Sequence, residues 1–223
     1  MARKRSDTRR NDTRSPSFAD SVFINCPFDK HYWPMFEAIV FCVVDCGFSP
    51  RSALEQIDSG DVRLQKIRTL ISGSKYAIHD ISRIEVSAAS PYPRFNMPFE
   101  LGLDLGCRFF GAGVCATKKC LILEKKQYRY QRVLSDIAGQ DIRAHHGSPD
   151  LAITIVREWL RNVSGRTTVP GPNQIKVHFR GFVNDLPKMA KVAGLDRKDL
   201  QFVDYLVLAS EWLKAVDKPP GSS

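Results

Sequence analysis

Short apolar runs alternate along this chain with longer segments of helical spacing, and the alternation restricts the fold more than any other feature. The apolar runs predict strands at residues 21–26, 48–54, 75–80, 119–124 and 142–145. The periodic segments predict helices at residues 33–46, 62–71, 97–107 and 150–162. Strands that alternate with helices form a parallel sheet with helices on both faces. We therefore predict an α/β fold, a flavodoxin-like doubly wound parallel sheet of about five strands, with Pro50 marking an edge strand.

The two flanks of this α/β domain, which spans 18–165, differ from it in composition. Residues 1–17 hold six basic and two acidic side chains without an apolar run, which is typical of a disordered basic tail. After a linker rich in Gly, Pro, Ser and Thr, residues 174–216 predict a helical extension in which Pro187 separates two helices and Asp196 caps the last one. About 40 residues cannot hold a strong core alone, so this extension should pack on the sheet domain or on a second subunit.

The composition argues against several classes of protein. No run of 18 uncharged apolar residues predicts a membrane span, and the N-terminal residues lack the apolar centre of a secretory signal. The net charge is +9, but four of these charges come from the tail, and no aromatic platform or recognition helix accompanies them. Nucleic-acid binding is therefore the least favoured function. The chain has neither a GxGxxG nor a GxxxxGK[ST] motif, which disfavours Rossmann dehydrogenases and P-loop NTPases.

The cysteine pattern indicates a reducing environment. Six cysteines are present, without a CxxC pair or a Cys/His set at zinc spacing. We expect them to be reduced thiols in a cytoplasmic protein, and we expect neither a metal nor a cofactor.

The densest polar chemistry lies between the end of the third strand, at Asp80, and the start of the next helix. Asn96 is suited to cap that helix and Pro98 to lie in its first turn. Glu100 would then lie close to the helix N-terminus, where the dipole favours an ionised carboxylate. An ionised carboxylate suits a nucleophile or a stabiliser of a cationic transition state better than a proton donor. The simpler alternative is that Glu100 is only a favourable acid at a helix start.

The carboxyl ends of parallel strands meet at one edge of a sheet, where ligands of open α/β folds bind. Residues of the predicted loops at that edge form our candidate binding set: Asn25, Phe28, Asp29, Arg51, Glu55, Asp58, Ser82, Arg83, Arg94 and Asn96. We interpret His79 as a core histidine, and His145 and His146 as part of a surface turn.

The sequence resembles a known superfamily over residues 21–163. A strand that ends in Asp80, a loop, the stretch PFELGLDLG at 98–106 and a strand at 120–123 are similar to the nucleoside 2-deoxyribosyltransferase superfamily, whose fold group includes TIR-type NAD-hydrolysing domains. The FINCPFD and PRFNMPFELG stretches also look like bacterial TIR-like nucleotide-binding proteins. The resemblance implies that Glu100 attacks the anomeric carbon of a sugar and that Asp80 orients the substrate. It also implies that Asn25 and Phe28 hold the base or sugar.

Departures from the family leave the substrate open. The segment 84–95 is longer than the transferase loop, and Glu55, Asp58, Arg63 and Lys66 have no counterpart. The resulting hypothesis is an N-glycosidase that acts on NAD or a related nucleotide or nucleoside, in a bacterial defence or stress system, as a homo-oligomer assembled through the C-terminal helices. Arg51, Arg83 or Arg94 would pair with phosphates. The alternative is a nucleotide-sensing module that binds without turnover.

Overall fold

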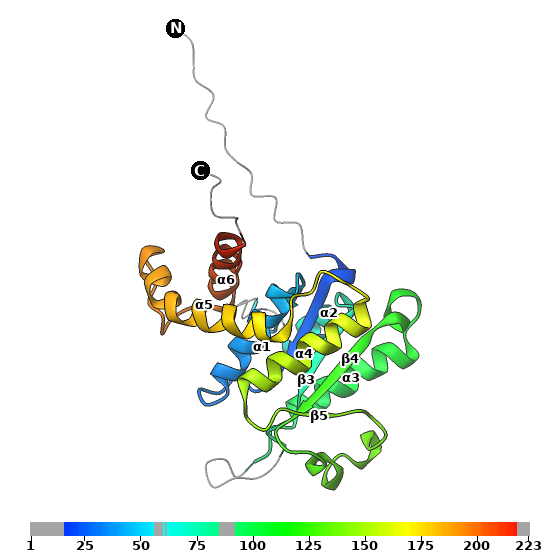
Figure 1. The fold of residues 1–223 in the computed structure, drawn as a ribbon. Helices are drawn as coiled ribbons and strands as arrows, with labels where there is room; N and C mark the ends of the chain where they lie inside the picture. Colours follow the sequence, from blue (N-terminus) through cyan, green and yellow to red (C-terminus); the bar gives the residue numbers. More distant parts are fainter. Residues whose placement is uncertain (1–15, 56–59, 61, 85–91, 218–223) are drawn as a thin grey trace.

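The computed structural model describes residues 16–55, 60, 62–84 and 92–217, and it contains a five-stranded, all-parallel sheet (Figure 1). The strand order is β2-β1-β3-β4-β5, which confirms the predicted flavodoxin-like order. The strands are β1 (Ser21–Asn25), β2 (Ser49–Arg51), β3 (Tyr76–Asp80), β4 (Lys119–Glu124) and β5 (Arg143–Ala144). β2, which contains Pro50, lies at an edge as predicted, because proline cannot donate a hydrogen bond to a second neighbour.

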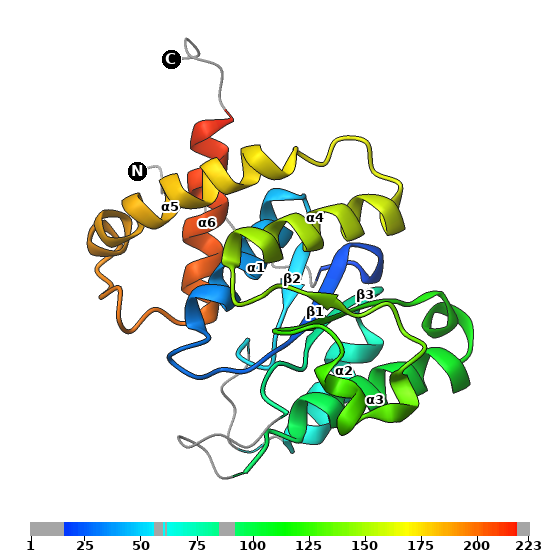
Figure 2. The ribbon, with the colours of Figure 1, turned by 60° about the horizontal axis from the view of Figure 1, so that its bottom comes forward.

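Helices cover both faces of the sheet (Figure 2). α1 (Trp33–Asp45) and α4 (Pro149–Ser164) lie on one face, and α2 (Arg63–Ser72) and α3 (Asn96–Phe110) lie on the other. Short 3₁₀ helices occur at Phe18–Asp20 (η1), Gly113–Thr117 (η2), Arg129–Arg132 (η3) and Ser135–Ile137 (η4). Every residue of β1 and β3 is buried, as expected for central strands of a sheet that is covered on both sides.

The C-terminal helices α5 (Pro172–Val192) and α6 (Phe202–Val216) pack outside α1 and extend the same hydrophobic core. Phe182 of α5 stacks on Phe41 of α1 with ring centroids 5.1 Å apart. The Tyr205 hydroxyl of α6 donates to the Glu37 carbonyl of α1 at 3.0 Å. The extension therefore packs on the sheet domain, which is one of the two arrangements predicted for it.

Two predicted details of this extension are wrong. Pro187 lies inside α5 instead of separating two helices, because residues on both sides of it, from Ile175 to Ala190, bury a continuous apolar face. Gln201 caps α6 instead of Asp196, because Gln201 and Asp204 form a reciprocal capping box. Within the described residues, no helix has the length and apolar character needed to cross a membrane.

Candidate functional site

Asp80 ends β3 and is completely buried. Its Oδ1 accepts the Ser82 backbone N–H at 2.8 Å, and its Oδ2 accepts the Tyr32 hydroxyl at 2.5 Å. His145 Nε2 lies 2.9 Å from the same Oδ2. Both carboxylate oxygens therefore have protein donors. The role of Asp80 in orienting a substrate stays a prediction, because a ligand hydroxyl would have to displace one of these donors.

His145 lies between β5 and α4 and is 2% exposed, so its predicted place in a surface turn is wrong. The Gly147 N–H donates to His145 Nδ1 at 3.0 Å, so the proton of the neutral ring is on Nε2, facing Asp80 and the Ser82 hydroxyl. Nucleophilic Ser-His-Asp sites bond the serine and the aspartate to opposite ring nitrogens. Here both partners share Nε2, so His145 positions Asp80 and does not activate Ser82.

Glu100 lies on the buried side of α3, and its side chain is 7% exposed. The predicted Asn96 cap is wrong: the helix begins at Asn96, preceded by Phe95 in a helical conformation, so Glu100 is beyond the first turn. Burial raises the pKa of Glu100, while the charges of Arg63, 3.8 Å away, and of His79 lower it less. The prediction that the helix start holds Glu100 ionised without a pKa increase is therefore corrected.

The Cys26 thiol, directly after β1, shows that several carboxylates converge at this edge. Cys26 is 1% exposed, and its pKa is raised well above the ordinary value, first by burial. The charges of Asp80, Glu100 and Asp29 raise it further. The loop after β1, the end of β3 and helix α3 thus bring three carboxylates within electrostatic range of one thiol, as the topology predicted.

Glu124, the last residue of β4, is a fourth carboxylate at this edge, and sequence reasoning missed it. It is 1% exposed, and it accepts backbone hydrogen bonds from Arg129 and Tyr130. Its Oε2 has no hydrogen-bond partner among the described residues. Burial first, and then the charge of Asp80, raise the pKa of Glu124 to about 7. The sequence contains a pattern that could have identified Glu124, because Glu124 ends a predicted apolar strand as Asp80 does. We call Asp29, Asp80, Glu100 and Glu124 the acid-rich edge.

Cationic side chains flank this edge. Asp29 Oδ1 accepts the backbone N–H groups of His31 and Tyr32, and it lies 3.1 Å from the Arg83 guanidinium. The Arg83 and Arg63 side chains are 42% and 60% exposed. These two arginines border the edge and remain accessible to solvent.

Other members of the candidate set make contacts inside the protein, are exposed to solvent or lie outside the described residues. Arg51 pairs with Glu55 at 2.9 Å beside the end of β2. The half-buried Phe28 ring packs edge-on against Phe36 at 5.5 Å. Arg94 and Asn96 are exposed. Asp58 lies outside the described residues.

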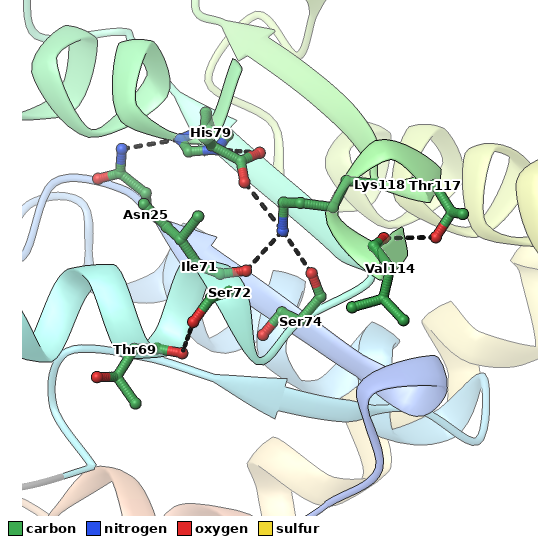
Figure 3. A network of polar contacts seen from close by, with 10 residues as sticks. Asn25, Thr69, Ile71, Ser72, Ser74, His79, Val114, Thr117 and Lys118 are labelled. Atoms are coloured by element: carbon green, nitrogen blue, oxygen red, sulfur yellow. Dashed lines mark hydrogen bonds and ion pairs between the residues drawn. The ribbon is translucent and has the colours of Figure 1, made fainter. Parts of the chain in front are cut away.

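A second polar network occupies the other face of β3, beneath α3 (Figure 3). The Lys118 ammonium, 1% exposed, donates to the carbonyls of Ile71, at 2.7 Å, and of Ser74, and it lies 3.0 Å from Asp104 Oδ1. Asp104 Oδ2 lies 3.3 Å from Nε2 of His79, which is buried as predicted.

Asn25 connects this network to α3. Its amide nitrogen donates to His79 Nδ1 and to the Met97 carbonyl, each at 3.0 Å, while its Oδ1 has no hydrogen-bond partner among the described residues. Its role in holding a base or sugar stays a prediction. Burial raises the pKa of Asp104, but contacts with His79 and Lys118 outweigh it, and the pKa falls below the ordinary value. We call these residues the Lys118 network: Asn25, His79, Asp104 and Lys118.

Two residues of this network and the neighbouring Cys120 have the side-chain types of a metal site, but the charges around them do not suit a cation. Ligand atoms of His79, Asp104 and Cys120 lie within 4.8 Å of one another. The Lys118 ammonium already contacts Asp104, and burial raises the pKa of the Cys120 thiol well above its ordinary value. A divalent cation would meet a fixed positive charge and a protonated thiol, so these residues do not fit one.

No protein-family model, curated protein or solved structure matches this chain. The resemblance to deoxyribosyltransferases and TIR-type domains therefore depends on the short sequence motifs alone.

Proposed function

We propose that the protein cleaves the N-glycosidic bond of NAD or a related nucleotide, with Glu100 as the residue that faces the sugar. The observation that supports this proposal is the buried Glu100 side chain at the carboxyl edge of a flavodoxin-like sheet. The charges of Glu100, Asp80 and Asp29 all raise the pKa of the Cys26 thiol, so the three carboxylates lie around one point of this edge. Open α/β sheets bind ligands at this edge.

The excess of carboxylates suits the charge that this reaction develops. Breaking the bond between C1′ and the base spreads positive charge over C1′ and the ring oxygen, and a nearby carboxylate stabilises it. Ionised Glu100 stabilises this cation or bonds to C1′ while the base leaves with the bonding electrons. Water then attacks C1′ and releases the carboxylate. Nicotinamide leaves NAD as a neutral base and needs no proton donor.

The flanking cations suit a phosphorylated substrate. Guanidinium groups pair with phosphate oxygens through two parallel hydrogen bonds. Arg63 and Arg83 are both solvent-accessible beside the acid-rich edge, where a pyrophosphate could reach them. We favour a nucleotide over an unphosphorylated nucleoside for this reason.

The test is base release by the purified full chain, incubated with NAD, ATP or nucleosides and followed by liquid chromatography. We expect release from a nucleotide, and Glu100→Gln should lower its rate at least about a hundredfold. Glu211→Gln, the same change at an exposed position of α6, is the matched control and should keep the wild-type rate. Equal rates for the wild type and Glu100→Gln would refute the mechanism.

A nucleotide-sensing module without turnover is the second candidate. It is favoured by the hydrogen bonding of Asp80, whose carboxylate oxygens already accept from three donors inside the protein. Asp80 is then held in place by the protein and is not available to take part in a reaction. Mass spectrometry of the ligand separates the two functions. A sensor returns the bound nucleotide intact after hours, whereas a glycosidase returns free base.

The biological setting and assembly belong to the same proposal. A role in bacterial defence or stress follows from the sequence resemblance alone. Assembly through the C-terminal helices is supported by exposed apolar side chains there, including Val192 at 83% and Val207 at 50%. Light scattering of the purified chain, compared with Val192→Asp, measures whether copies associate through this surface.

A further inference from the structure

Two cysteines meet where helix α3 ends. Cys107 is in the last turn of α3 and Cys115 is in η2, which follows a short turn. The Cys107 carbonyl accepts the Gly111 N–H at 3.0 Å. A Cβ atom added to Gly111 would lie 2.7 Å from the Cys115 Cβ and 2.2 Å from the Cys107 carbonyl oxygen. The absence of a side chain at Gly111 therefore lets η2 fold back on the helix end, and the Cys115 side chain contacts that of Cys107.

Accessibility distinguishes this pair from the other close pair of cysteines. Cys42 and Cys46 are neighbours on α1, but they are 0% and 4% exposed inside the main core. Cys107 and Cys115 are only half-buried, and all six cysteines are free. A small reagent in solution can therefore reach Cys107 and Cys115 without unfolding the protein.

We propose that Cys107 and Cys115 form a reversible disulfide by exchange with a low-molecular-weight disulfide. The Cys115 thiolate attacks one sulfur of the reagent, forms a mixed disulfide and releases one reagent thiolate. Cys107 then loses its proton to solvent, its sulfur attacks the Cys115 sulfur, and the second reagent thiolate leaves. Two protein thiols are oxidised, and one reagent disulfide is reduced to two thiols.

The environment of Cys107 supports this order of steps. Burial, and then its contact with Cys115, raise the pKa of the Cys107 thiol to about 11. Cys107 is therefore mainly protonated in the reduced protein and is the poorer first nucleophile, since the thiolate is the nucleophile in exchange. The two thiols lie in hydrogen-bond contact on either side of the turn at Gly111, so the disulfide forms between side chains that are already neighbours.

The bond would link η2 to the end of α3 beside the Lys118 network. Lys118 directly follows η2, and Asp104 lies on α3 one turn before Cys107. Both partners of this buried ion pair are thus anchored close to the disulfide, so the oxidised protein should unfold at a higher temperature than the reduced protein. Neither cysteine belongs to the acid-rich edge, so the inference does not depend on the proposed function.

The test uses the folded full chain, oxidised glutathione, an alkylating quench and digestion with trypsin without reductant. Trypsin cleaves after Arg108 and separates peptides 95–108 and 109–118. We expect these two peptides to appear as one linked species, lighter than their sum by two hydrogen atoms, which dithiothreitol separates. In Cys107→Ser, the peptide 109–118 should instead carry glutathione, because the resolving thiol is absent.

Peptide 31–51, which holds Cys42 and Cys46, is the control within the same digest. It should stay reduced and become alkylated once the protein is denatured. The proposal fails if peptides 95–108 and 109–118 remain unlinked. It also fails if peptide 31–51 is oxidised to the same extent, because the reaction would then report an unfolded chain.

Discussion

His79 and Asp80 are neighbours on β3, yet their side chains enter two polar networks of opposite character. His79 joins the Lys118 network, in which a buried ammonium lies 3.0 Å from the Asp104 carboxylate (Figure 3). Asp80 belongs to the acid-rich edge, where its own oxygens meet a hydroxyl, a backbone N–H and His145. The first network holds one carboxylate beside a buried ammonium, whereas the second gathers several carboxylates whose neighbouring cations, Arg63 and Arg83, are exposed to solvent.

The pKa directions follow this difference in charge balance. The pKa of Asp104 lies below its ordinary value because His79 and Lys118 outweigh burial, whereas burial raises the pKa values of Glu100 and Glu124. A matched ion pair maintains the fold. Buried carboxylates without a buried cation beside them lower stability when ionised, and such groups concentrate at functional sites. The contrast supports a structural role for the Lys118 network and is consistent with the function proposed for the acid-rich edge.

The largest expected effect tests the claim that the Lys118 network is structural. Asp104→Asn leaves the Lys118 ammonium buried without its anion, so we expect the free energy of unfolding to fall by about 3–5 kcal/mol. Urea unfolding measures this free energy for the wild type and the variant. Asp141→Asn at an exposed position is the control. Combining Asp104→Asn with Lys118→Met should recover much of the loss, and a loss below about 1 kcal/mol in the single variant would contradict the matched pair.

The second prediction concerns Glu124, whose pKa rises from an ordinary 4.5 to about 7 in the folded protein. The folded state then binds more protons than the unfolded state between these values, so this group's contribution to stability is present below pH 4.5 and is lost as the pH rises through 7. The shift corresponds to about 3 kcal/mol. Removing the charge with Glu124→Gln should therefore raise stability relative to the wild type more at pH 8 than at pH 5.

Urea unfolding of both proteins at the two pH values gives this difference and cancels any pH-independent cost of the glutamine. Glu158→Gln, an exposed change on α4, should show no such dependence. A Glu124→Gln effect that is equal at pH 5 and pH 8 would mean that Glu124 is ionised as easily as an exposed glutamate.

A smaller effect is expected where Asp80 organises its neighbours. Asp80→Asn replaces one accepting oxygen by a donor that faces Tyr32 or Ser82, so a buried donor loses its acceptor. We expect the free energy of unfolding to fall by about 1–3 kcal/mol, measured by urea unfolding. Asp29→Asn, which weakens a partly exposed pair with Arg83, should cost less. Equal losses in the free energy of unfolding for the two variants would contradict a structural role for the buried hydrogen bonds to Asp80.

The smallest effect on stability is expected at Arg63, whose side chain is 60% exposed and lies 3.8 Å from Glu100. Arg63→Ala should change the free energy of unfolding by less than about 1 kcal/mol, because water and salt screen this contact. Arg161→Ala, exposed on α4, is the comparison. A loss of several kcal/mol would show that Glu100 has a matched cation and would remove the contrast between the two networks.

The sequence by itself determined the sheet and the location of its carboxyl edge. Apolar runs and helical periodicity are local properties, so they placed all five strands and the order of helices between them. Pro50 identified the edge strand because its missing N–H is a property of the residue. Asp80 could be assigned to the carboxyl edge because it ends a strand, which the chain order alone reveals.

Only the tertiary structure decided the ionisation and partners of the side chains at that edge. The pKa of Glu100 depends on burial and on Arg63, 37 positions earlier in the chain, whereas sequence reasoning considered only the helix start. His145 meets Asp80 because the segment after β5 folds over the end of β3, and nothing local in the sequence distinguishes it from the exposed His146. Burial and through-space charge act between residues distant in the chain, so a local pattern locates a carboxylate but cannot assign its charge.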